Sequence, residues 1–168
     1  MAIFYFQARV VQRSKGHSAV AKAAYLAGVK LKNERTGLTY NHTNKMDIDC
    51  TFLFGWSGNR EELWNMVEAA ENRKDSTVAR EYVVALPAEL SIVQRQVLAI
   101  KLAKKIHDRY GVAVDLCLHG ANSENPHAHI LTTTREVYPI YNELGSKSIV
   151  DISNDARKKW VFLVIKSS

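Results

Sequence analysis

Three histidines within eleven residues constrain this chain more than any other feature of its sequence. His119, His127 and His129 lie on either side of a short loop that is rich in turn-forming residues. Alternating and β-branched apolar residues predict strands over residues 112–118 and 129–135. The sequence therefore predicts an antiparallel hairpin that carries all three histidines.

The predicted hairpin brings the three imidazoles to one place. Residues two apart on a strand project from the same face, so His127 and His129 project together, and His119 can join them across the ladder. Three imidazoles on a rigid sheet are typical of a metal site that keeps positions open for substrate. The alternative is that one histidine caps the loop and the other two are ordinary surface residues.

The length of the chain predicts one domain, residues 1–168, with a core of its own. No stretch of about 18 apolar residues is present, so we expect no membrane-spanning helix. The N-terminus lacks a basic segment followed by an apolar one, so we expect no signal peptide and a cytoplasmic protein. Cys50 and Cys117 are then reduced thiols, and their spacing is not that of metal ligands.

Positive charge is concentrated near the N-terminus. The whole chain has a net charge of +6, whereas residues 1–45 carry eight basic residues and one acidic residue, a net +7. A one-sided basic segment favours a polyanion as partner, most simply nucleic acid. The alternative is a solvated surface that happens to be basic.

The order of the predicted elements indicates an α+β fold. Strands are expected over residues 2–11, 78–86, 112–118 and 129–135, helices over 19–29, 60–72 and 91–110, and a short hairpin over 32–42. The expected helix N-caps are Ser18, Ser91 and either Ser57 or Asn59, and the expected helix ends are Gly28 and Gly111. We expect a central, mainly antiparallel sheet with helices packed on one face and the two histidine strands in the middle, a two-layer sandwich.

The helix over 60–72 has a clear expected solvent-facing stripe, which consists of Glu61, Asn65, Glu68 and Asn72. Residues 136–168 are poorly assigned. They are loop-like over 138–148, a helix can begin near Asp155, and the apolar run over 161–165 is left without an assignment.

Tyr25 is the candidate nucleophile. On the predicted helix over 19–29, Lys22 and Tyr25 share one face. A phenol beside a cation ionises more easily and can approach a phosphate. The alternative is a half-buried tyrosine that only packs against the core.

Three segments resemble the motifs of a known family. The residues in question are Met1–Phe4 with Ser14–Tyr25, then Ala79–Leu90, then Asn125–Thr133. In this order they resemble the motifs of MobA/MobL-type conjugative relaxases, a group that includes the relaxase region of Ti-plasmid TraA. The third is similar to the His-hydrophobe-His signature of HUH endonucleases. The motifs span residues 1–135, and together they are specific.

The resemblance implies an HUH relaxase-like fold and a defined reaction. Members of the family nick one strand of plasmid DNA at an origin of transfer, through a tyrosine that stays attached to the 5′ phosphate, and later rejoin the ends. Carried over to this sequence, Tyr25 is the nucleophile. His119, His127 and His129 hold a divalent metal, with Mn²⁺ or Mg²⁺ expected and Zn²⁺ or others able to bind the same ligands.

Glu81 matches the acidic position of the second motif. It is expected either to accept the phenol proton or to hydrogen-bond a ligand histidine. The alternative is a surface salt bridge with Arg80. Asp115 is a weaker candidate for a partner of the histidines, because it lies on the same strand face as His119.

The implied partner is single-stranded DNA at an origin of transfer, together with other relaxosome and coupling proteins, and no membrane. Arg13, Lys15 and Lys22 are the expected phosphate contacts. Family members usually continue well past the third motif, so we expect their larger C-terminal regions to be absent from this chain.

Two other functions stay open at this point. One is a rolling-circle replication initiator or transposase of the HUH group, although those often place the tyrosine after the histidine motif, whereas Tyr25 precedes it. The other is a non-catalytic module that binds single-stranded DNA and whose histidines are structural.

Overall fold

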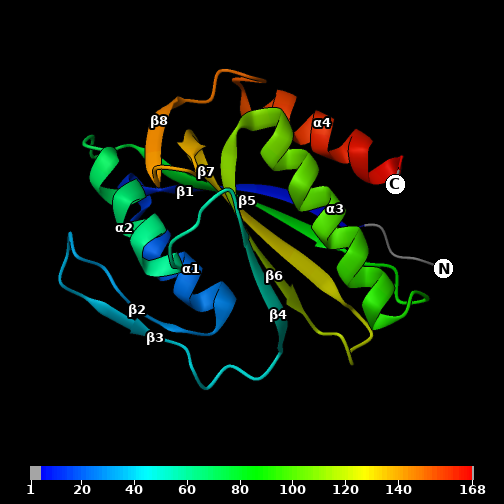
Figure 1. Ribbon diagram of the computed structural model, residues 1–168. Helices are drawn as coiled ribbons and strands as arrows, with labels where there is room; N and C mark the ends of the chain where they lie inside the picture. The colour runs from blue at the N-terminus through cyan, green and yellow to red at the C-terminus, as the bar shows by residue number, and fades with distance from the viewer. Residues whose placement is uncertain (1–4, 168) are drawn as a thin grey trace.

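The computed structural model describes residues 5–167 and consists of one central sheet, a small second sheet and four α-helices (Figure 1). The strands are β1 Phe6–Gln12, β2 Lys30–Lys32, β3 Thr39–Asn41, β4 Ile48–Phe54, β5 Thr77–Ala85, β6 Val112–His119, β7 His127–Tyr138 and β8 Glu143–Lys147. The helices are α1 Ala19–Ala27, α2 Arg60–Ala70, α3 Ile92–Tyr110 and α4 Asn154–Lys166, with a 3₁₀ turn over Arg13–Lys15. Over residues 5–167, no helix has the length and apolar character needed to span a bilayer.

The central sheet has the strand order β1-β5-β7-β6-β4, and β8 pairs with β7. Every pairing between these strands is antiparallel. The α+β class and the antiparallel sheet are therefore confirmed. The two histidine strands, β6 and β7, lie in its interior as expected, and strand alternation along them decides which side chains meet.

Helices cover both faces of the sheet, so the expectation of helices on one face only is wrong (Figure 1). The reason lies in β6, where every residue is buried. Val112, Val114, Leu116 and Leu118 belong to the core under α3 and α4. Ala113 and Cys117 belong to the core under α1 and α2. Because both faces of β6 are apolar, both must be covered.

The helix caps follow the sequence closely. Ser18, Asn59 and Ser91 each accept a hydrogen bond from the backbone N–H three residues on. Gly28 and Gly111 end α1 and α3 with φ of 63° and 66°, where glycine is favoured. Asn59, rather than Ser57, is the N-cap of α2.

The least patterned regions are also ordered elements. The edge strand β4 was not predicted, and β8 occupies part of the expected loop over 138–148. The helix α4 absorbs the unassigned apolar run over 161–165, because one side of it, centred on Val161, is buried under the sheet. The strand expected over 2–11 begins at Phe6 in the described residues, and residues 2–4 lie outside them.

The predicted wet stripe of α2 is wrong at two positions. Asn65 and Glu68 are both buried. The Asn65 side chain donates to the Lys32 carbonyl at 2.8 Å, and the Glu68 carboxylate accepts from the Ala19 N–H at 2.7 Å. These polar contacts join α2 to the small hairpin and to the start of α1, and so they hold α1 in place over the sheet.

Candidate active site

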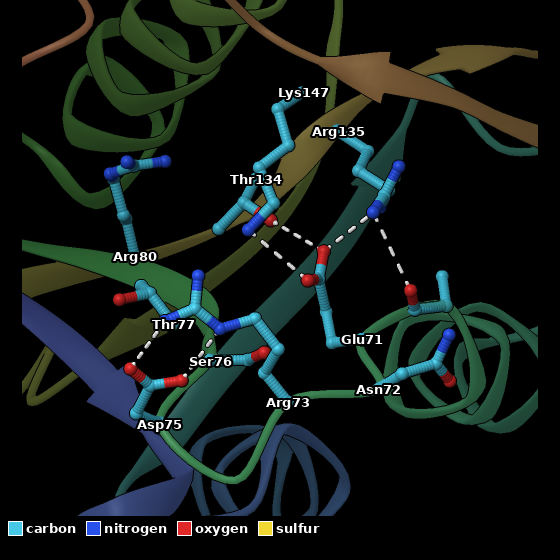
Figure 2. A pocket seen from close by; sticks show the side chains of 11 residues that line it. Glu71, Asn72, Arg73, Asp75, Ser76, Thr77, Arg80, Thr134, Arg135 and Lys147 are labelled. Atoms are coloured by element: carbon cyan, nitrogen blue, oxygen red, sulfur yellow. Dashed lines mark hydrogen bonds and ion pairs between the residues drawn. The ribbon is translucent and has the colours of Figure 1, made fainter.

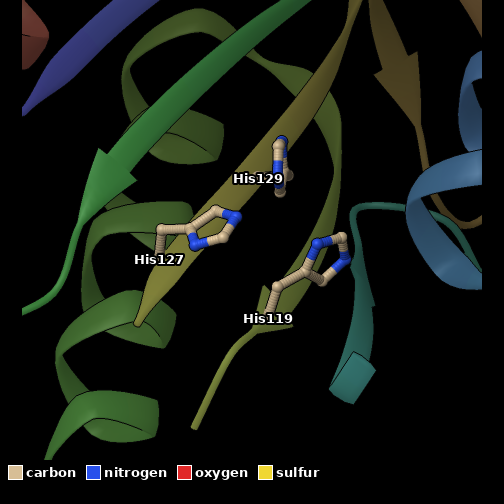
Figure 3. Close-up of side chains that lie close together, drawn as sticks. All are labelled: His119, His127 and His129. Carbon is tan, nitrogen blue, oxygen red and sulfur yellow. The ribbon is translucent and has the colours of Figure 1, made fainter. Parts of the chain in front are cut away.

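The hairpin of β6 and β7 brings the three histidines together (Figure 3). In the strand register His119 lies opposite His127, and Cys117 lies opposite His129. The imidazole centroids are 4.6–5.5 Å apart, and the three potential ligand nitrogens lie within 4.8 Å of one another. The predicted convergence of the histidines is confirmed.

Each imidazole has one ring nitrogen held by an acceptor oxygen. The three pairs are His127 Nδ1 with the Asn125 carbonyl at 2.9 Å, His129 Nδ1 with Glu81 Oε1 at 2.7 Å, and His119 Nε2 with the Leu26 carbonyl at 2.7 Å. A carbonyl or carboxylate oxygen accepts only, so these nitrogens carry the protons. The lone pairs then lie on Nε2 of His127 and His129 and on Nδ1 of His119. This is the arrangement in which three neutral imidazoles fit a divalent metal.

Burial keeps two of these imidazoles neutral. Burial lowers the pKa of His119 to about 4, and it also lowers the pKa of His129, although Glu81 acts in the opposite direction. Neutral imidazoles retain the lone pair that metal ligation requires. At neutral pH His119 and His129 can thus bind a cation without first losing protons.

Glu81 is a fully buried carboxylate between a ligand candidate and a lysine. Its Oε1 accepts from His129, and its Oε2 lies 2.8 Å from Lys22 Nζ. Burial alone raises the pKa of Glu81, but hydrogen bonds and charge from His129 and Lys22 outweigh it and lower the pKa to about 2. The expected alternative, a salt bridge with Arg80, is wrong. Neighbours on a strand face opposite sides, and Arg80 Nε donates to Asn154 Oδ1 at 3.1 Å.

The helix α1 ties Tyr25 to the histidines. Its Leu26 carbonyl accepts from His119, and its Lys22 pairs with Glu81. Tyr25 lies between these two contacts along the helix, and 49% of it is exposed. The expected candidate nucleophile is therefore on an element that contacts the histidine cluster directly at His119 and, through Glu81, at His129.

The cation beside Tyr25 is Lys45 rather than Lys22. Lys45 Nζ lies 4.0 Å from the centre of the Tyr25 ring and 3.4 Å from the Tyr25 carbonyl oxygen. His42 contacts the same ring edge-on, with centroids 5.4 Å apart. Sequence reasoning missed both neighbours. The one signal in the sequence was that Lys45 belongs to the basic N-terminal segment.

Asp115 does not serve the histidines, contrary to expectation. Its carboxylate makes two hydrogen bonds with Arg60, at 2.7 and 2.9 Å, and accepts from Trp64 Nε1 at 3.0 Å. Its side chain is 1% exposed. Asp115 therefore anchors α2 to the sheet, at a distance of four residues along β6 from His119.

The three residues expected to contact phosphate differ in their surroundings. The Arg13 guanidinium binds the Glu68 carboxylate at 2.8 Å and the Glu68 and Glu71 carbonyls at the end of α2, which argues against a role in DNA binding. Lys22 is engaged by Glu81. Lys15, in the 3₁₀ turn before α1, is exposed and stays a predicted phosphate contact.

A protein-family comparison settles the kinship of the chain. The family model described as the MobA/MobL family matches residues 17–162. The chain belongs to this family. The predicted resemblance to MobA/MobL conjugative relaxases is confirmed, on a match that includes Tyr25, Glu81 and all three histidines.

Individual relatives agree with this assignment. Mobilization protein MobL of Acidithiobacillus ferridurans is 36% identical over 89% of this chain and 47% of its own length. Conjugal transfer protein TraA of Rhizobium radiobacter is 34% identical over 94% of this chain and 16% of its own length. This MobA/MobL chain thus spans less than half of either relative.

A solved structure has the same fold. The structure is described by the words "Molecular Basis of Vancomycin Resistance Transfer in Staphylococcus aureus", and its chain is 33% identical to this one. The TM-score is 0.83, and the match covers 95% of this chain and 87% of that one. The arrangement of the sheet and helices is therefore shared with that solved structure.

Proposed function

We propose that this MobA/MobL chain nicks and rejoins one strand of plasmid DNA at an origin of transfer, through a covalent 5′-phosphotyrosine at Tyr25. The observation that carries the proposal is the cluster of His119, His127 and His129, whose ring protons are all directed to acceptors outside the cluster. The same α1 helix that supplies one of those acceptors carries Tyr25. We place the reaction in the cytoplasm, on single-stranded DNA, with other relaxosome and coupling proteins as partners.

The reaction is a transesterification at phosphorus. The Tyr25 phenol oxygen attacks the scissile phosphate, a Tyr–O–P bond forms, and the bond from phosphorus to the 3′ oxygen breaks. The phenol gives up its proton, and the leaving 3′ oxygen gains one. The number of phosphodiester bonds is conserved, so the reverse reaction can rejoin the strand.

The three histidines would hold a divalent cation, with Mn²⁺ or Mg²⁺ favoured and Zn²⁺ able to take the same ligands. Such an ion supplies Lewis acidity to the non-bridging phosphate oxygens. The chain's own contribution is to keep His119 and His129 neutral by burial and to fix their orientation through hydrogen bonds.

Glu81 acts as a positioning residue in this proposal. A carboxylate with a pKa of about 2 that is already bound to His129 and Lys22 is a weak base for a phenol proton. Its role is to orient His129 and, through Lys22, to fix α1. Lys45 and His42 hold the Tyr25 ring from two sides.

The test uses fluorescent single strands that tile candidate transfer origins, incubated with the wild-type chain and Mn²⁺. A denaturing gel resolves a slow-migrating covalent adduct. We expect the adduct to be lost in Tyr25→Phe and His127→Ala and to be prevented by EDTA. Tyr138→Phe is the matched control, because Tyr138 is also 49% exposed but lies at the far end of β7.

Two results would contradict the proposal. If no adduct forms on an origin that a longer homologue cleaves, the chain is a module that binds single-stranded DNA without nicking it. If an adduct forms equally well in Tyr25→Phe, another tyrosine is the nucleophile. An adduct on a replication origin rather than a transfer origin would instead favour an initiator of the HUH group.

A further inference from the structure

Two arginines, Arg80 and Arg157, lie on the sheet face opposite the histidines. Arg80 follows Ala79 and precedes Glu81 on β5, so its side chain projects away from the histidine face. It borders a cavity of about 170 Å³ at the β1 edge of the sheet, between β1, β5 and α4. The described residues that line this cavity include the side chains of Arg80 and Arg157 and no acidic residue. Arg9 also borders it, but Arg9 lies opposite Glu81 in the strand register, so its side chain projects from the histidine face.

Arg157 is buried without a carboxylate of its own. It is 1% exposed, stacks on the Tyr110 ring at 4.3 Å, and donates from Nη2 to the Ser148 carbonyl at 3.1 Å. Its buried Nε has no hydrogen-bond partner in the described part of the chain. The Asp151 carboxylate is hydrogen-bonded to Arg109, and this bond, together with a smaller effect of the Arg157 charge, lowers the pKa of Asp151. A buried guanidinium is ordinarily paired, so this one has unused donor capacity.

Arg80 is in a similar position. Arg80 and Arg157 line the same cavity, and burial together with the charge of Arg157 lowers the pKa of Arg80. The hydrogen-bond acceptor of Arg80 is the neutral amide of Asn154. The buried hydroxyl of Tyr82 lies in the same cavity and can donate to an anion.

A second, larger cavity makes Arg80 stand out (Figure 2). This cavity, of about 520 Å³, has Arg80 on one wall and three further cations around it. Each of those three is already paired with a carboxylate: Arg135 and Lys147 share Glu71, and Arg73 pairs with Asp75. Figure 2 shows the Arg80 guanidinium apart from these pairs. Arg80 therefore borders both cavities, and neither carboxylate labelled in Figure 2 is paired with its guanidinium.

We propose that Arg80 and Arg157, with the hydroxyl of Tyr82, bind a phosphate group. The smaller cavity has room for a tetrahedral oxyanion but not for a whole nucleotide, and guanidinium forks match phosphate oxygens in geometry. Two sources share this chemistry. One is a backbone phosphodiester of the transferred strand, passing round the β1 edge outside the active site, and this source rests on the proposed function. The other is free inorganic phosphate.

The experiment compares the wild-type chain with Arg80→Gln, in EDTA and without any nicking readout. Arg73→Gln is the matched control, because Arg73 lines the larger cavity but is paired with Asp75 and its side chain is 80% exposed. In the first arm, inorganic phosphate is titrated and followed by ³¹P NMR at constant ionic strength. We expect binding to be at least tenfold weaker in Arg80→Gln and unchanged in Arg73→Gln.

The second arm identifies the source of the phosphate. Binding of a single-stranded oligonucleotide without an origin sequence is measured from about 50 to 200 mM salt. If the site takes a backbone phosphodiester, the slope of log K against log salt falls by about 0.7 in Arg80→Gln, as for one lost contact to a single strand. If Arg80→Gln loses phosphate binding but keeps the wild-type salt slope for the oligonucleotide, the site is supported and its ligand is free phosphate.

Equal phosphate binding by Arg80→Gln and the control would overturn the proposal. If Arg80→Gln does not fold, as judged by circular dichroism, Tyr82→Phe replaces it, since it removes only a buried hydroxyl that lines the cavity, and unchanged phosphate binding in that variant would equally overturn the proposal. The same measurements on Tyr25→Phe must match the wild type, because the site does not involve the nucleophile. Failure of this site would therefore leave the nicking proposal intact, and the reverse also holds.

Discussion

Glu81→Gln is the substitution that most directly probes how the fold prepares the proposed metal ligands. It keeps the size of the side chain but removes the negative charge that His129 Nδ1 and Lys22 Nζ face at 2.7 and 2.8 Å. The amide can present its NH₂ group to His129, which would favour the tautomer with its lone pair turned away from the cluster. Lys22 would also be left as an unpaired cation near the metal site.

The expected magnitude follows from this geometry. Loss of a hydrogen-bonded partner behind a metal-ligating histidine typically costs 10–100-fold in metal affinity, or about 1.4–2.7 kcal/mol. Because Glu81 supports one ligand and also neutralises Lys22, we expect a loss of roughly 30-fold or more, toward the upper part of that range. Isothermal titration of the metal-free protein with Mn²⁺ at neutral pH measures it directly.

Glu71→Gln is the matched control. Glu71 is another buried carboxylate held by two cations, Arg135 at 2.8 Å and Lys147 at 3.1 Å, but it contacts none of the histidines. We expect it to lower stability and to leave Mn²⁺ affinity within about twofold. If Glu71→Gln and Glu81→Gln weaken Mn²⁺ binding equally, the loss reflects general destabilisation, and the positioning role of Glu81 is wrong.

Three further predictions follow from contacts around the site. Lys45→Met should slow adduct formation by about tenfold at unchanged strand affinity, because the cation over the Tyr25 ring is lost, and Lys45→Arg should restore most of the rate; equal rates for both variants would refute this. Since the folded pKa of His119 is lowered to about 4, its contribution to stability is complete above about pH 6.5 and is lost as the pH falls toward 4. The free energy of unfolding, measured in urea without metal, should therefore fall between pH 7 and pH 4.5 by about 2–3 kcal/mol more in the wild type than in His119→Gln. An equal fall in both proteins would contradict the lowered pKa of His119. Asp115→Asn should cost about 3 kcal/mol of unfolding free energy by breaking the buried pair with Arg60, yet titration should give unchanged Mn²⁺ affinity; weaker binding in a folded variant would revive Asp115 as a partner of the histidines.

The parts of the site that were predictable from the sequence are those specified over short distances along the chain. The hairpin that carries the histidines needs only strand alternation and a loop rich in turn formers. The caps at Ser18 and Ser91 are set by the residues within one turn of each helix. These local rules placed Tyr25 on its helix and the three histidines on one face of the sheet.

The errors involve partners that are distant in sequence. Arg13 was expected to contact phosphate, whereas its guanidinium pairs with Glu68 across 55 residues. Asp115 was assigned to the histidines by strand position, but Arg60, also 55 residues away, takes its carboxylate. A charge pattern read along the sequence carries no information on such pairings, because they depend on how α2 packs on the sheet.

The error about the two faces of the sheet has a consequence for the chemistry. A sheet with one open face would leave the histidines exposed to water and their imidazoles close to their ordinary pKa. Because α1 covers that face, His119 is 3% exposed and donates to the Leu26 carbonyl. Any interaction that favours this tautomer of His119, as metal binding to Nδ1 would, also favours the docked position of α1. If the proposed metal site is occupied, the helix that carries Tyr25 is therefore coupled energetically to that occupancy, and the two halves of the proposed reaction centre would stabilise each other.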